Sequence, residues 1–452
     1  MQTLEGVKLI KDIEQKYDVM SIKWKGVSVW PFLRLYLKES ITTQRENKAS
    51  ASNIKLVLKC LFSYNPFRAI KRHEVWSFTA CDRRKQIGRK RIHRVSGAFA
   101  SEGMNCLMIE KPLKGLGHYK RDEIEEKDIV SEAWLLMSFH IIEFVSRHFA
   151  LKLDKEDLLK KILKDNNLTF NYHRCVHMLN AQRKAMRFML ALAPKPKVAM
   201  MECPYDKMGY MWAFHDVGVK VVEMQHGSLN GNHIAYNGKA YETSTNPDCI
   251  CVFGEDEYNY FINEEPQYAP TVRMTGLYIL ERTNRYFVED VFEKDKENYK
   301  AVIVVAGQPV YEDRLSSFID SVAMENKELL FIYIPRQNRD DLRFESDNVR
   351  LVNGVNIYEY LKWADLHMTI TSTTGLESQY FRTPTIFYDD QKIASRYFKG
   401  VLDESNGVRF VETPEQFTAA FDDLYRHNFS YREIFAHNHV RRIKEVIEDY
   451  LK

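Results

Sequence analysis

A histidine follows an apolar run in the first half of the chain, where an expected strand turns into a polar loop. Residues 221–236 read VVEMQHGSLNGNHIAY, so β-branched residues precede His226 and Gly227 follows it. A histidine near neutrality can take a proton from a hydroxyl, and a nearby carboxylate can orient the ring or act as the base itself. Glu202, in MMECPYDKMGY, also comes directly after a strand-like run. We therefore predict that His226 and Glu202 are catalytic; the alternative is a histidine that serves a structural turn.

Polar side chains flank this histidine on both sides. The loop beyond it is rich in Ser, Asn and Gly, residue types that form turns. In open α/β sheets the ligand binds in the loops beyond the carboxyl ends of the strands. We expect four residues to line the acceptor or leaving-group side of the site: Gln225, Asn230, Asn232 and His233.

A second polar segment lies in the other half, in TITSTTGLESQYFRTPTIFYDD (369–390). A strand-like run ends there in hydroxyl residues and a glycine, and LESQYF then begins a helix. Hydroxyls and backbone amides at a helix N-terminus form an anion site that the helix dipole reinforces. The pattern predicts a phosphate site, with Glu377 accepting a ribose hydroxyl or favouring the dipole; an ordinary helix cap is the alternative. The predicted residues are Ser372, Thr373, Thr374, Gly375 and Glu377.

Two further loops point to the same sheet edge. The run 301–307 is followed by Gln308, and the run 329–335 is followed by Arg336. Loops after neighbouring strands of a doubly wound sheet converge on one crevice. We therefore expect Gln308 to contact the same ligand and Arg336 to bind a phosphate bidentately. An ordinary surface arginine is the alternative.

The sequence gives little support to metal chemistry or to other nucleotide-binding motifs. His173 and His177 stand four residues apart without the Glu of an HExxH motif, and neither GxxxxGK[ST] nor GxGxxG occurs. We interpret Asp389-Asp390 as a turn at a strand end. We therefore expect no metal ligand and no bound cofactor.

The elements that must position these residues alternate between strands and helices, which is typical of an α/β fold. A chain of 452 residues exceeds the size of one hydrophobic core. We predict two Rossmann-like domains that face a cleft, at 71–282 and 283–452, after a helical, aromatic and basic segment at 1–70. Predicted strands are 75–80, 105–110, 197–202, 219–225, 249–254, 301–307, 329–335, 349–353, 366–372 and 384–390. The longest helix is predicted at about 170–192, and a closing helix of the second domain at about 430–451.

Composition indicates a folded globular protein. Hydrophobic residues make up 45% and charged residues 28% of the chain, and a net charge of +3 from 65 basic and 62 acidic residues is too balanced for a nucleic-acid binder. Seven scattered cysteines without a CxxC pair suit a reducing compartment. The charged N-terminal sequence lacks a signal peptide's apolar core, and no run of about 18 apolar residues occurs. We expect a cytoplasmic protein that binds no nucleic acid.

Residues 53–95 form a basic segment with interleaved aromatic and aliphatic residues, in IKLVLKCLFSYNPFRAIKRH and DRRKQIGRKRIHR. This composition resembles a surface that meets anionic lipid headgroups, where each basic residue contributes about 1 kcal/mol. We expect peripheral attachment to the inner face of the cell membrane. A solvated helix face followed by a basic loop is the alternative.

Together these motifs resemble GT-B glycosyltransferases of bacterial surface polysaccharide synthesis, of the capsule, O-antigen and teichoic-acid type. The resemblance covers roughly 195–400 and rests on the QHG turn, the STTGLE turn and the Thr-Pro-Thr strand after it. The stretch SIKWKGVSVWPFLRLYL (21–37) also resembles the aromatic N-terminal segment of some of these proteins. The resemblance implies transfer of a sugar or polyol phosphate from a CMP-, CDP- or UDP-activated donor. The expected acceptor is a hydroxyl of a glycan or lipid-linked glycan, and no divalent metal is required.

The resemblance also implies roles for individual residues. In teichoic-acid polymerases a histidine followed by glycine deprotonates the acceptor hydroxyl, and His226 matches it. In CMP-sialic acid and related transferases a His-Pro turn and a Ser/Thr pair hold the nucleotide, and Ser372, Thr373 and Thr374 match the hydroxyl pair. The sequence departs from that pattern at the His-Pro turn, whose place is taken by Ile334-Pro335-Arg336, where the guanidinium would supply the cation.

Two other functions remain open at this point. A sugar-nucleotide 2-epimerase has the same two-domain fold but needs more acid and base residues around the hexose. A non-catalytic GT-B-like subunit of a polysaccharide assembly complex would keep the fold and lack the base. Binding of CMP, CDP or UDP separates this last function from the two enzymes.

Overall fold

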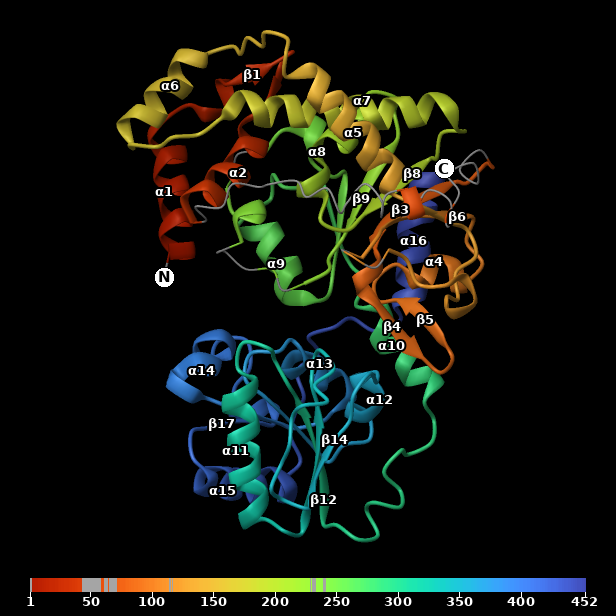
Figure 1. The fold of residues 1–452 in the computed structure, drawn as a ribbon, viewed down its shortest axis with the longest axis vertical. Helices are drawn as coiled ribbons and strands as arrows, with labels where there is room; N and C mark the ends of the chain where they lie inside the picture. The colour runs from red at the N-terminus through yellow and green to blue at the C-terminus, as the bar shows by residue number, and fades with distance from the viewer. Residues whose placement is uncertain are drawn as a thin grey trace. The chain divides into compact units, whose positions relative to one another are not determined.

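The computed structural model describes residues 2–42, 58–60, 64, 71–113, 115, 117–227, 229, 233–238 and 241–452 (Figure 1). The chain divides into two compact units. Unit 1 comprises Met1–Arg84, Arg91–Thr275 and Asn438–Lys452, and unit 2 comprises Lys85–Lys90 and Gly276–His437.

Unit 1 is built on a seven-stranded parallel sheet in the order β11-β10-β9-β8-β3-β6-β7. Its inner strands are short apolar runs that are buried along their whole length, such as VAMM in β8 and CICV in β10, as expected for a sheet covered on both faces. The chain order reverses between the neighbouring strands β3 and β8. The strands are β3 Val75–Ala80, β6 Cys106–Lys111, β7 Ile129–Ser131, β8 Val198–Met201, β9 Lys220–Met224, β10 Cys249–Val252 and β11 Thr271–Met274.

Helices cover this sheet, and the N-terminal helices belong to its core. Trp30 of α2 is fully buried in one cluster with residues of β3, β6, α7 and α8. The helices are α1 Gln2–Lys16, α2 Trp30–Thr42, α4 Gly97–Ser101, α5 Ala133–Ser146, α6 Glu156–Asp165, α7 Tyr172–Leu192, α8 Met208–His215, α9 Glu255–Asn263 and α16 His439–Leu451. Two short hairpins complete the strands, β1 Lys23–Trp24 with β2 Val27–Ser28, and β4 Arg84–Ile87 with β5 Lys90–His93.

Unit 2 contains a six-stranded parallel sheet in the order β14-β13-β12-β15-β16-β17. Counted from the first strand of the unit, this is the order 3-2-1-4-5-6 of a Rossmann fold, which reverses between β12 and β15. The strands are β12 Ala301–Ala306, β13 Leu329–Ile334, β14 Val349–Leu351, β15 Leu366–Thr369, β16 Thr385–Tyr388 and β17 Val408–Val411. The helices are α10 Tyr278–Tyr286, α11 Glu312–Glu325, α12 Ile357–Leu361, α13 Thr374–Phe381, α14 Ile393–Phe398 and α15 Pro414–Arg426.

All ten strands predicted from the sequence overlap an observed strand, and the predicted long helix corresponds to α7. The two hairpins, β1–β2 and β4–β5, were not predicted. Three short strands of the large sheets were also missed: β7, β11 and β17. Each lies at the edge of its sheet, where one side of the strand needs no apolar neighbour, and two of them carry an arginine, Arg273 and Arg409, inside the strand.

The predicted domain limits differ from the two units in four places, one of which is Lys85–Lys90, a part of unit 2 that lies inside the predicted 71–282 domain. The predicted closing helix begins only at His439 and lies in unit 1, where Ile443 and Val446 are buried and the ring nitrogen Nδ1 of His439 lies 2.8 Å from the carbonyl oxygen of Thr275. The division falls after Thr275 instead of 282, so that α10 belongs to unit 2. Residues 2–42 are part of unit 1 and form no separate segment, while most of 43–70 lies outside the described residues.

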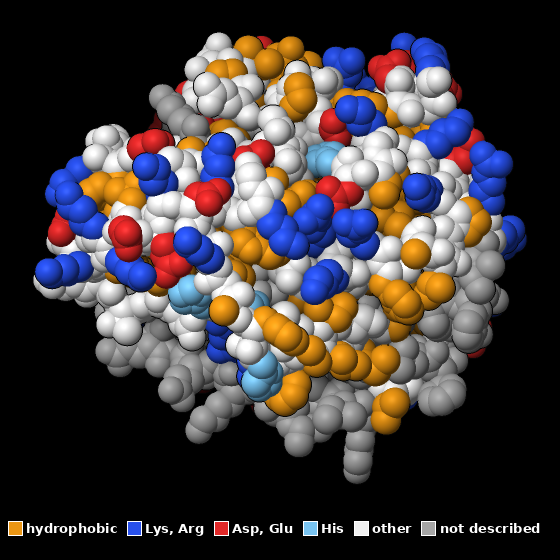
Figure 2. All heavy atoms as spheres, turned by 90° about the horizontal axis from the view of Figure 1, so that it is seen from above, with side chains coloured by type: hydrophobic (Ala, Val, Ile, Leu, Met, Phe, Trp, Pro, Cys, Tyr) orange, Lys and Arg blue, Asp and Glu red, His pale blue; other side chains and the backbone are white. Residues whose placement is uncertain are grey.

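No helix among the described residues is long and apolar enough to span a bilayer. The face of the molecule that is seen from above carries apolar side chains interspersed with lysine and arginine (Figure 2). Of the basic segment 53–95, residues 53–57, 61–63 and 65–70 lie outside the description, and 75–95 form β3, η3 (Cys81–Arg83) and the β4–β5 hairpin.

Candidate functional site

The first candidate site lies in unit 1 at the carboxyl ends of β3 and β8. Because the strand order reverses there, the two following loops diverge and leave a crevice, the usual ligand position in such sheets. A cavity of about 330 Å³ occupies this position. Its charged lining consists of three basic and three acidic residues: Arg83, Lys111, Lys207, Asp82, Asp206 and Glu202.

Glu202 is held in a tight network at this edge. Its side chain is only 3% exposed and accepts hydrogen bonds from Arg83 Nη1 at 2.8 Å and from Ser96 Oγ at 2.9 Å. The ring nitrogen Nδ1 of His93 lies 3.3 Å from the same carboxylate. Both carboxylate oxygens therefore have partners, and the geometry favours a role for Glu202 in fixing Arg83 over a role as base.

His226 comes after β9 and reaches the same edge. Its Nε2 atom lies 3.1 Å from Cys203 Sγ and 3.5 Å from the hydroxyl of Tyr205. Arg83 Nη2 donates to the same sulfur at 3.0 Å. The predicted direct pair of His226 and Glu202 is therefore replaced by a chain of contacts that runs through Cys203 and Arg83.

Cys203 was not predicted as a site residue. Its backbone has φ of 50° and ψ of 56°, a left-handed conformation that is uncommon for a residue with a side chain and that is found in clusters at functional sites. The one sequence signal that could have identified it is its position next to Glu202, directly after β8. Burial raises the pKa of the Cys203 thiol, so the sulfur can donate its proton to His226.

The surroundings of His226 keep its ring neutral. Burial, followed by the positive charges of Arg83, His233, Arg94 and Lys207, lowers its pKa to about 3. Its Nδ1 atom is buried and has no hydrogen-bond partner among the described residues. A neutral imidazole has a nitrogen that can accept a proton, and an anion in the cavity would strengthen it as a base because it would offset the neighbouring cations.

The residues predicted on the acceptor side have different positions. Gln225 is 1% exposed and braces the turn, because its side chain accepts from the Phe253 amide at 2.6 Å and donates to the Gly227 carbonyl and to Glu257 at 2.9 and 3.0 Å. His233 caps a short helical turn and packs against the ring of Tyr205 at 5.5 Å. The predicted residues Asn230 and Asn232 lie outside the described residues.

The second candidate site lies in unit 2 at the carboxyl ends of β12 and β15, again where the strand order reverses. Gln308, after β12, bridges the two loops: its Oε1 accepts from the Thr371 amide at 2.8 Å and its Nε2 donates to the Thr371 hydroxyl at 3.1 Å. Gly307 permits this approach, since a Cβ atom there would lie 2.4 Å from Glu312 Oε1 and 3.0 Å from Pro335 Cα. The loops that would meet a ligand are thus fixed to each other.

Two of the predicted phosphate-binding hydroxyl residues lie at the surface of this edge. Ser372 is half-buried and Thr373 is exposed. The amides of Gly375 and Leu376 already donate to the carbonyl oxygens of Ser372 and Thr373, at 3.0 and 2.9 Å. The hydroxyls of Ser372 and Thr373 and their own backbone amides are therefore the groups of this turn that are best placed for an anion.

The other predicted residues of the turn point into unit 2. The Thr374 hydroxyl lies 3.0 Å from His367 Nε2 in the core, and the side chain of Glu377 is 1% exposed. Glu377 accepts from the Thr373 hydroxyl at 3.2 Å, so that hydroxyl must exchange this bond before it can donate to a ligand. Gly375 packs against Phe387, whose ring would lie 2.4 Å from an added Cβ.

Arg336 directly follows the buried Pro335 beyond β13, one strand away from the reversal. Its side chain is exposed, and no ion pair or hydrogen bond of it is found among the residues that the structure describes. The guanidinium is therefore available to an anionic ligand, and its binding of a phosphate stays a prediction.

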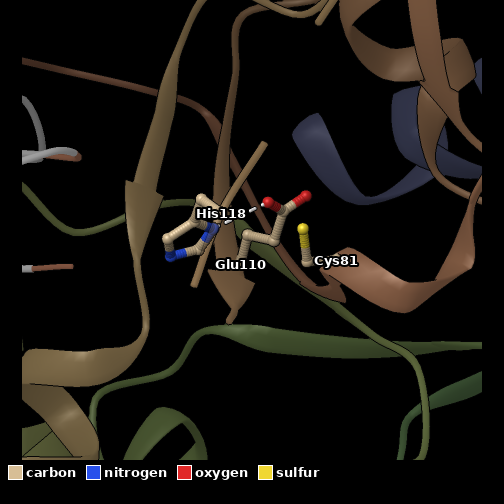
Figure 3. Close-up of side chains that lie close together, drawn as sticks. All are labelled: Cys81, Glu110 and His118. Atoms are coloured by element: carbon tan, nitrogen blue, oxygen red, sulfur yellow. Dashed lines mark hydrogen bonds and ion pairs between the residues drawn. The ribbon is translucent and has the colours of Figure 1, made fainter. Parts of the chain in front are cut away.

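A third polar cluster joins Cys81, Glu110 and His118, whose ligand atoms all lie within 4.8 Å of one another (Figure 3). The Glu110 carboxylate already accepts from Arg84 Nε at 2.6 Å and lies 3.0 Å from His118 Nδ1. Burial would raise its pKa, but the charge of Arg84 and the hydrogen bond of His118 lower it to about 2. Burial raises the pKa of the Cys81 thiol to about 12, which opposes the thiolate that a metal would need. The cluster is thus suited to hold Arg84, not a metal cation.

No protein-family model and no curated protein matches the chain. Solved structures match it at low identity. S. aureus MnaA in a structure with UDP is 10% identical over 84% of this chain and 97% of that chain, with a TM-score of 0.52. The UDP-GlcNAc 2-epimerase from Neisseria meningitidis bound to UDP-GlcNAc is 10% identical over 83% and 99%, with a TM-score of 0.50. The glycosyltransferase of kitacinnamycin is 10% identical over 84% and 100%, with a TM-score of 0.49.

These similarities and the two sheets define the class of fold. The chain has two Rossmann-like α/β units in a GT-B-like arrangement of elements, which confirms the fold class predicted from the sequence. The UDP-GlcNAc 2-epimerase from Neisseria meningitidis has this fold. At these identities the similarity extends to the fold alone.

The buried cluster around Arg84 predicts a strong effect of removing one charge. Glu110→Gln leaves the fully buried Arg84 with Glu126 as its remaining carboxylate partner, so we expect the free energy of unfolding of unit 1 to fall by about 3–5 kcal/mol. Urea denaturation followed by tryptophan fluorescence measures this. Because the pKa of Glu110 is lowered in the folded state, its contribution is present above pH 4.5 and is lost as the pH falls toward 2. The control is Glu445→Gln at the exposed Arg441 pair, for which we expect no measurable change in the free energy of unfolding. Equal midpoints for the two variants would contradict the assignment.

The charge environment of His226 predicts its titration. In histidine-labelled protein, NMR should find the His226 ring neutral down to about pH 4, since its pKa is about 3. Arg83→Met removes a neighbouring cation and leaves Glu202 unpaired, so both changes should raise the pKa of His226. His226→Gln identifies the resonance. A wild-type His226 that titrates between pH 6 and 7, or an unchanged pKa in Arg83→Met, would show that the described surroundings are not those in solution.

Proposed function

We propose that this protein is a glycosyltransferase that moves a sugar or polyol phosphate from a CMP-, CDP- or UDP-activated donor to a hydroxyl of a bacterial surface glycan. The observation that carries the proposal is that each Rossmann-like sheet presents polar residues at its own point of strand reversal. Unit 2 offers hydroxyls and amides suited to phosphate, and unit 1 offers a neutral histidine beside a cavity lined with charges. A transferase needs both functions, one for the donor and one for the acceptor.

In this proposal unit 2 holds the phosphate of the donor. The Ser372 hydroxyl and the amides of Ser372 and Thr373 donate hydrogen bonds to its oxygens at the N-terminus of α13, and Arg336 adds a guanidinium. The Thr373 hydroxyl joins them by exchanging its bond to Glu377 for one to the phosphate. When the bond between the sugar and the phosphate breaks, negative charge grows on the leaving oxygen. Fixed donors and the dipole of the helix stabilise that charge without reorganisation. The bridge from Gln308 to Thr371 keeps the two loops in position during the reaction.

Unit 1 activates the acceptor in this proposal. The acceptor hydroxyl replaces Cys203 as the partner of His226 Nε2, transfers its proton to that nitrogen, and attacks the reacting carbon or phosphorus of the donor. The electron pair of the broken bond leaves with the nucleotide. Cations near the ring make it a weak base when the site is empty, and the negative charge of a bound substrate offsets them. Proton transfer is therefore favoured when substrate is present.

The remaining charged residues of the cavity have supporting roles in this proposal. Glu202 balances Arg83, which in turn holds the sulfur of Cys203. Glu202 is then a positioning residue and His226 the catalytic one. Lys111 and Lys207 face the same cavity and suit an acceptor that carries negative charge.

The donor site predicts a loss of nucleotide affinity. Ser372→Ala with Thr373→Ala should weaken binding of whichever of CMP, CDP or UDP binds the wild type, because each hydrogen bond to a charged phosphate contributes about 1.5–3 kcal/mol. Isothermal titration calorimetry measures the affinity. The matched control is Ser317→Ala with Ser321→Ala on the exposed face of α11, whose affinity should equal that of the wild type. Unchanged affinity in the first double variant refutes the donor site, and a wild type that binds no nucleotide favours a non-catalytic subunit.

The acceptor site predicts a loss of turnover without a loss of donor binding. His226→Ala should lower transfer by about 10²–10⁴, the range for general-base catalysis, while calorimetry finds the nucleotide affinity nearly unchanged. His226→Gln keeps a hydrogen-bonding side chain that cannot take a proton at neutral pH, so it should lose as much activity as the alanine variant. Restored transfer in the glutamine variant would reduce His226 to a positioning role. Conversion of UDP-GlcNAc to its 2-epimer by the wild type would replace the transferase with a 2-epimerase.

A further inference from the structure

Helix α5 presents a row of large apolar side chains to solvent. Met137, Ile141, Phe144 and Val145 are 37%, 58%, 56% and 52% exposed, and their spacing of three and four residues places them on one face of the helix. Phe149, three residues after the end of the helix, is 68% exposed. A helix that is apolar on its outer face as well as its inner face is unusual for a surface helix of a soluble domain.

The neighbouring helix α7 extends this surface. It packs against α5, and its Phe188 and Leu192, four residues apart, are 54% and 61% exposed. Of the sixteen exposed large apolar side chains in the described part of the chain, seven belong to α5, α7 and Phe149. We call these seven residues the apolar face. Monomers seldom leave so many apolar side chains together in water unless a partner covers them.

A groove adjoins the apolar face. It encloses about 480 Å³ and is lined by Trp24, Ile141, Val145 and Phe149 among others. Lysine side chains, Lys25 and Lys184, also line it. Apolar walls with cationic borders suit the acyl chains and charged headgroups of a lipid.

Basic residues surround the apolar face. Lys25, Arg147, Lys184 and Arg187 are exposed, and Figure 2 shows lysine and arginine side chains gathered beside apolar ones on the face seen from above. The guanidinium of Arg147 lies 4.2 Å from the ring centre of Phe144. A long basic side chain that lies along apolar surface with its charge at the rim is typical of membrane interfaces. Two acidic groups are close: Glu143, which is 13% exposed, and Asp216, which lies 3.7 Å from Arg187.

We propose that the apolar face and its basic rim dock on an anionic lipid bilayer. The seven side chains enter the boundary between headgroups and acyl chains, and the basic rim meets the lipid phosphates. Charge argues against a second copy as the occupant, because a symmetric dimer would bring the same basic rims together. The inference is independent of the proposed catalysis and of residues 53–95. In a transferase, docking would hold unit 1 where lipid-linked acceptors reside.

Co-sedimentation of the full chain with lipid vesicles tests the proposal. The wild type should pellet with vesicles of phosphatidylcholine and phosphatidylglycerol, pellet less with phosphatidylcholine alone, and be released by salt. Ile141→Ser with Phe144→Ser should lower the partition coefficient at least about tenfold, because two apolar side chains no longer enter the lipid. Arg147→Glu with Lys184→Glu should abolish the preference for anionic vesicles. All four positions are exposed, so circular dichroism of the variants should match the wild type.

A matched control separates this surface from non-specific adsorption of exposed apolar side chains, and Ile141→Ser/Phe144→Ser, which keeps residues 53–95, separates it from that segment. Val310→Ser with Tyr397→Ser changes two side chains of unit 2 that are 84% and 67% exposed, and this variant should bind vesicles like the wild type. Equal binding by Ile141→Ser/Phe144→Ser and the wild type would overturn the proposal. A wild type that pellets with neither kind of vesicle would also overturn it. A wild-type dimer in solution that Ile141→Ser/Phe144→Ser converts to a monomer would also overturn it and identify a self-association surface.

Discussion

Parallel pairing in both large sheets determines where the polar residues of this protein lie. Neighbouring parallel strands must be joined by a crossover, so all strands of a sheet end at the same edge, and a crevice opens where the chain order reverses. In unit 1 this places the residues after β3 beside those after β8, and in unit 2 it places Gln308 beside Thr371. Because the sheets are buried on both faces, a charge near a strand end must find its partner within the protein. The buried bonds from Arg84 to Glu110 and Glu126 meet that requirement.

The same requirement shapes the chemistry at the edge of unit 1. Glu202 neutralises Arg83 inside the fold, so the carboxylate that the sequence offers as a base already serves as a counterion. Arg83 in turn contacts the sulfur of Cys203, which separates it from the ring of His226. His226 is left without a carboxylate of its own in the described structure, and burial with nearby cations favours its neutral form. The pKa of such a base rises when a negatively charged substrate binds beside it, so proton transfer depends on occupancy of the site.

Sequence patterns predicted the inner strands of both sheets because such strands are continuous apolar runs, whereas β7, β11 and β17 are short edge strands with weaker patterns. They also predicted which residues follow strand ends, since parallel sheets place these residues at one edge. Side-chain direction was not predictable: Thr374 turns toward His367 although Thr373 beside it is exposed, and Gln225 braces its own turn. Ion pairs between residues far apart in the chain could not be predicted either, since Arg83 and Glu202 are 119 residues apart.

The N-terminal helices complete this site by long-range contacts of the same kind. Arg34 of α2 is 2% exposed, pairs with Glu14 of α1 at 2.6 Å, and donates to the carbonyl of Ile234 at 2.5 Å, 200 residues later. The indole nitrogen of Trp30 donates to the Glu14 carboxylate at 2.8 Å and so helps to orient that carboxylate toward Arg34. The backbone is thereby held just before His226 by Gln225, and again at Ile234 by the guanidinium of Arg34 from α2. Removal of Glu14 would leave the buried cation of Arg34 uncompensated, so the pair holds both helices in this position. The aromatic sequence at 21–37 therefore has a structural connection to the Gln-His-Gly turn: it contains Arg34, whose guanidinium binds the backbone at Ile234, after that turn.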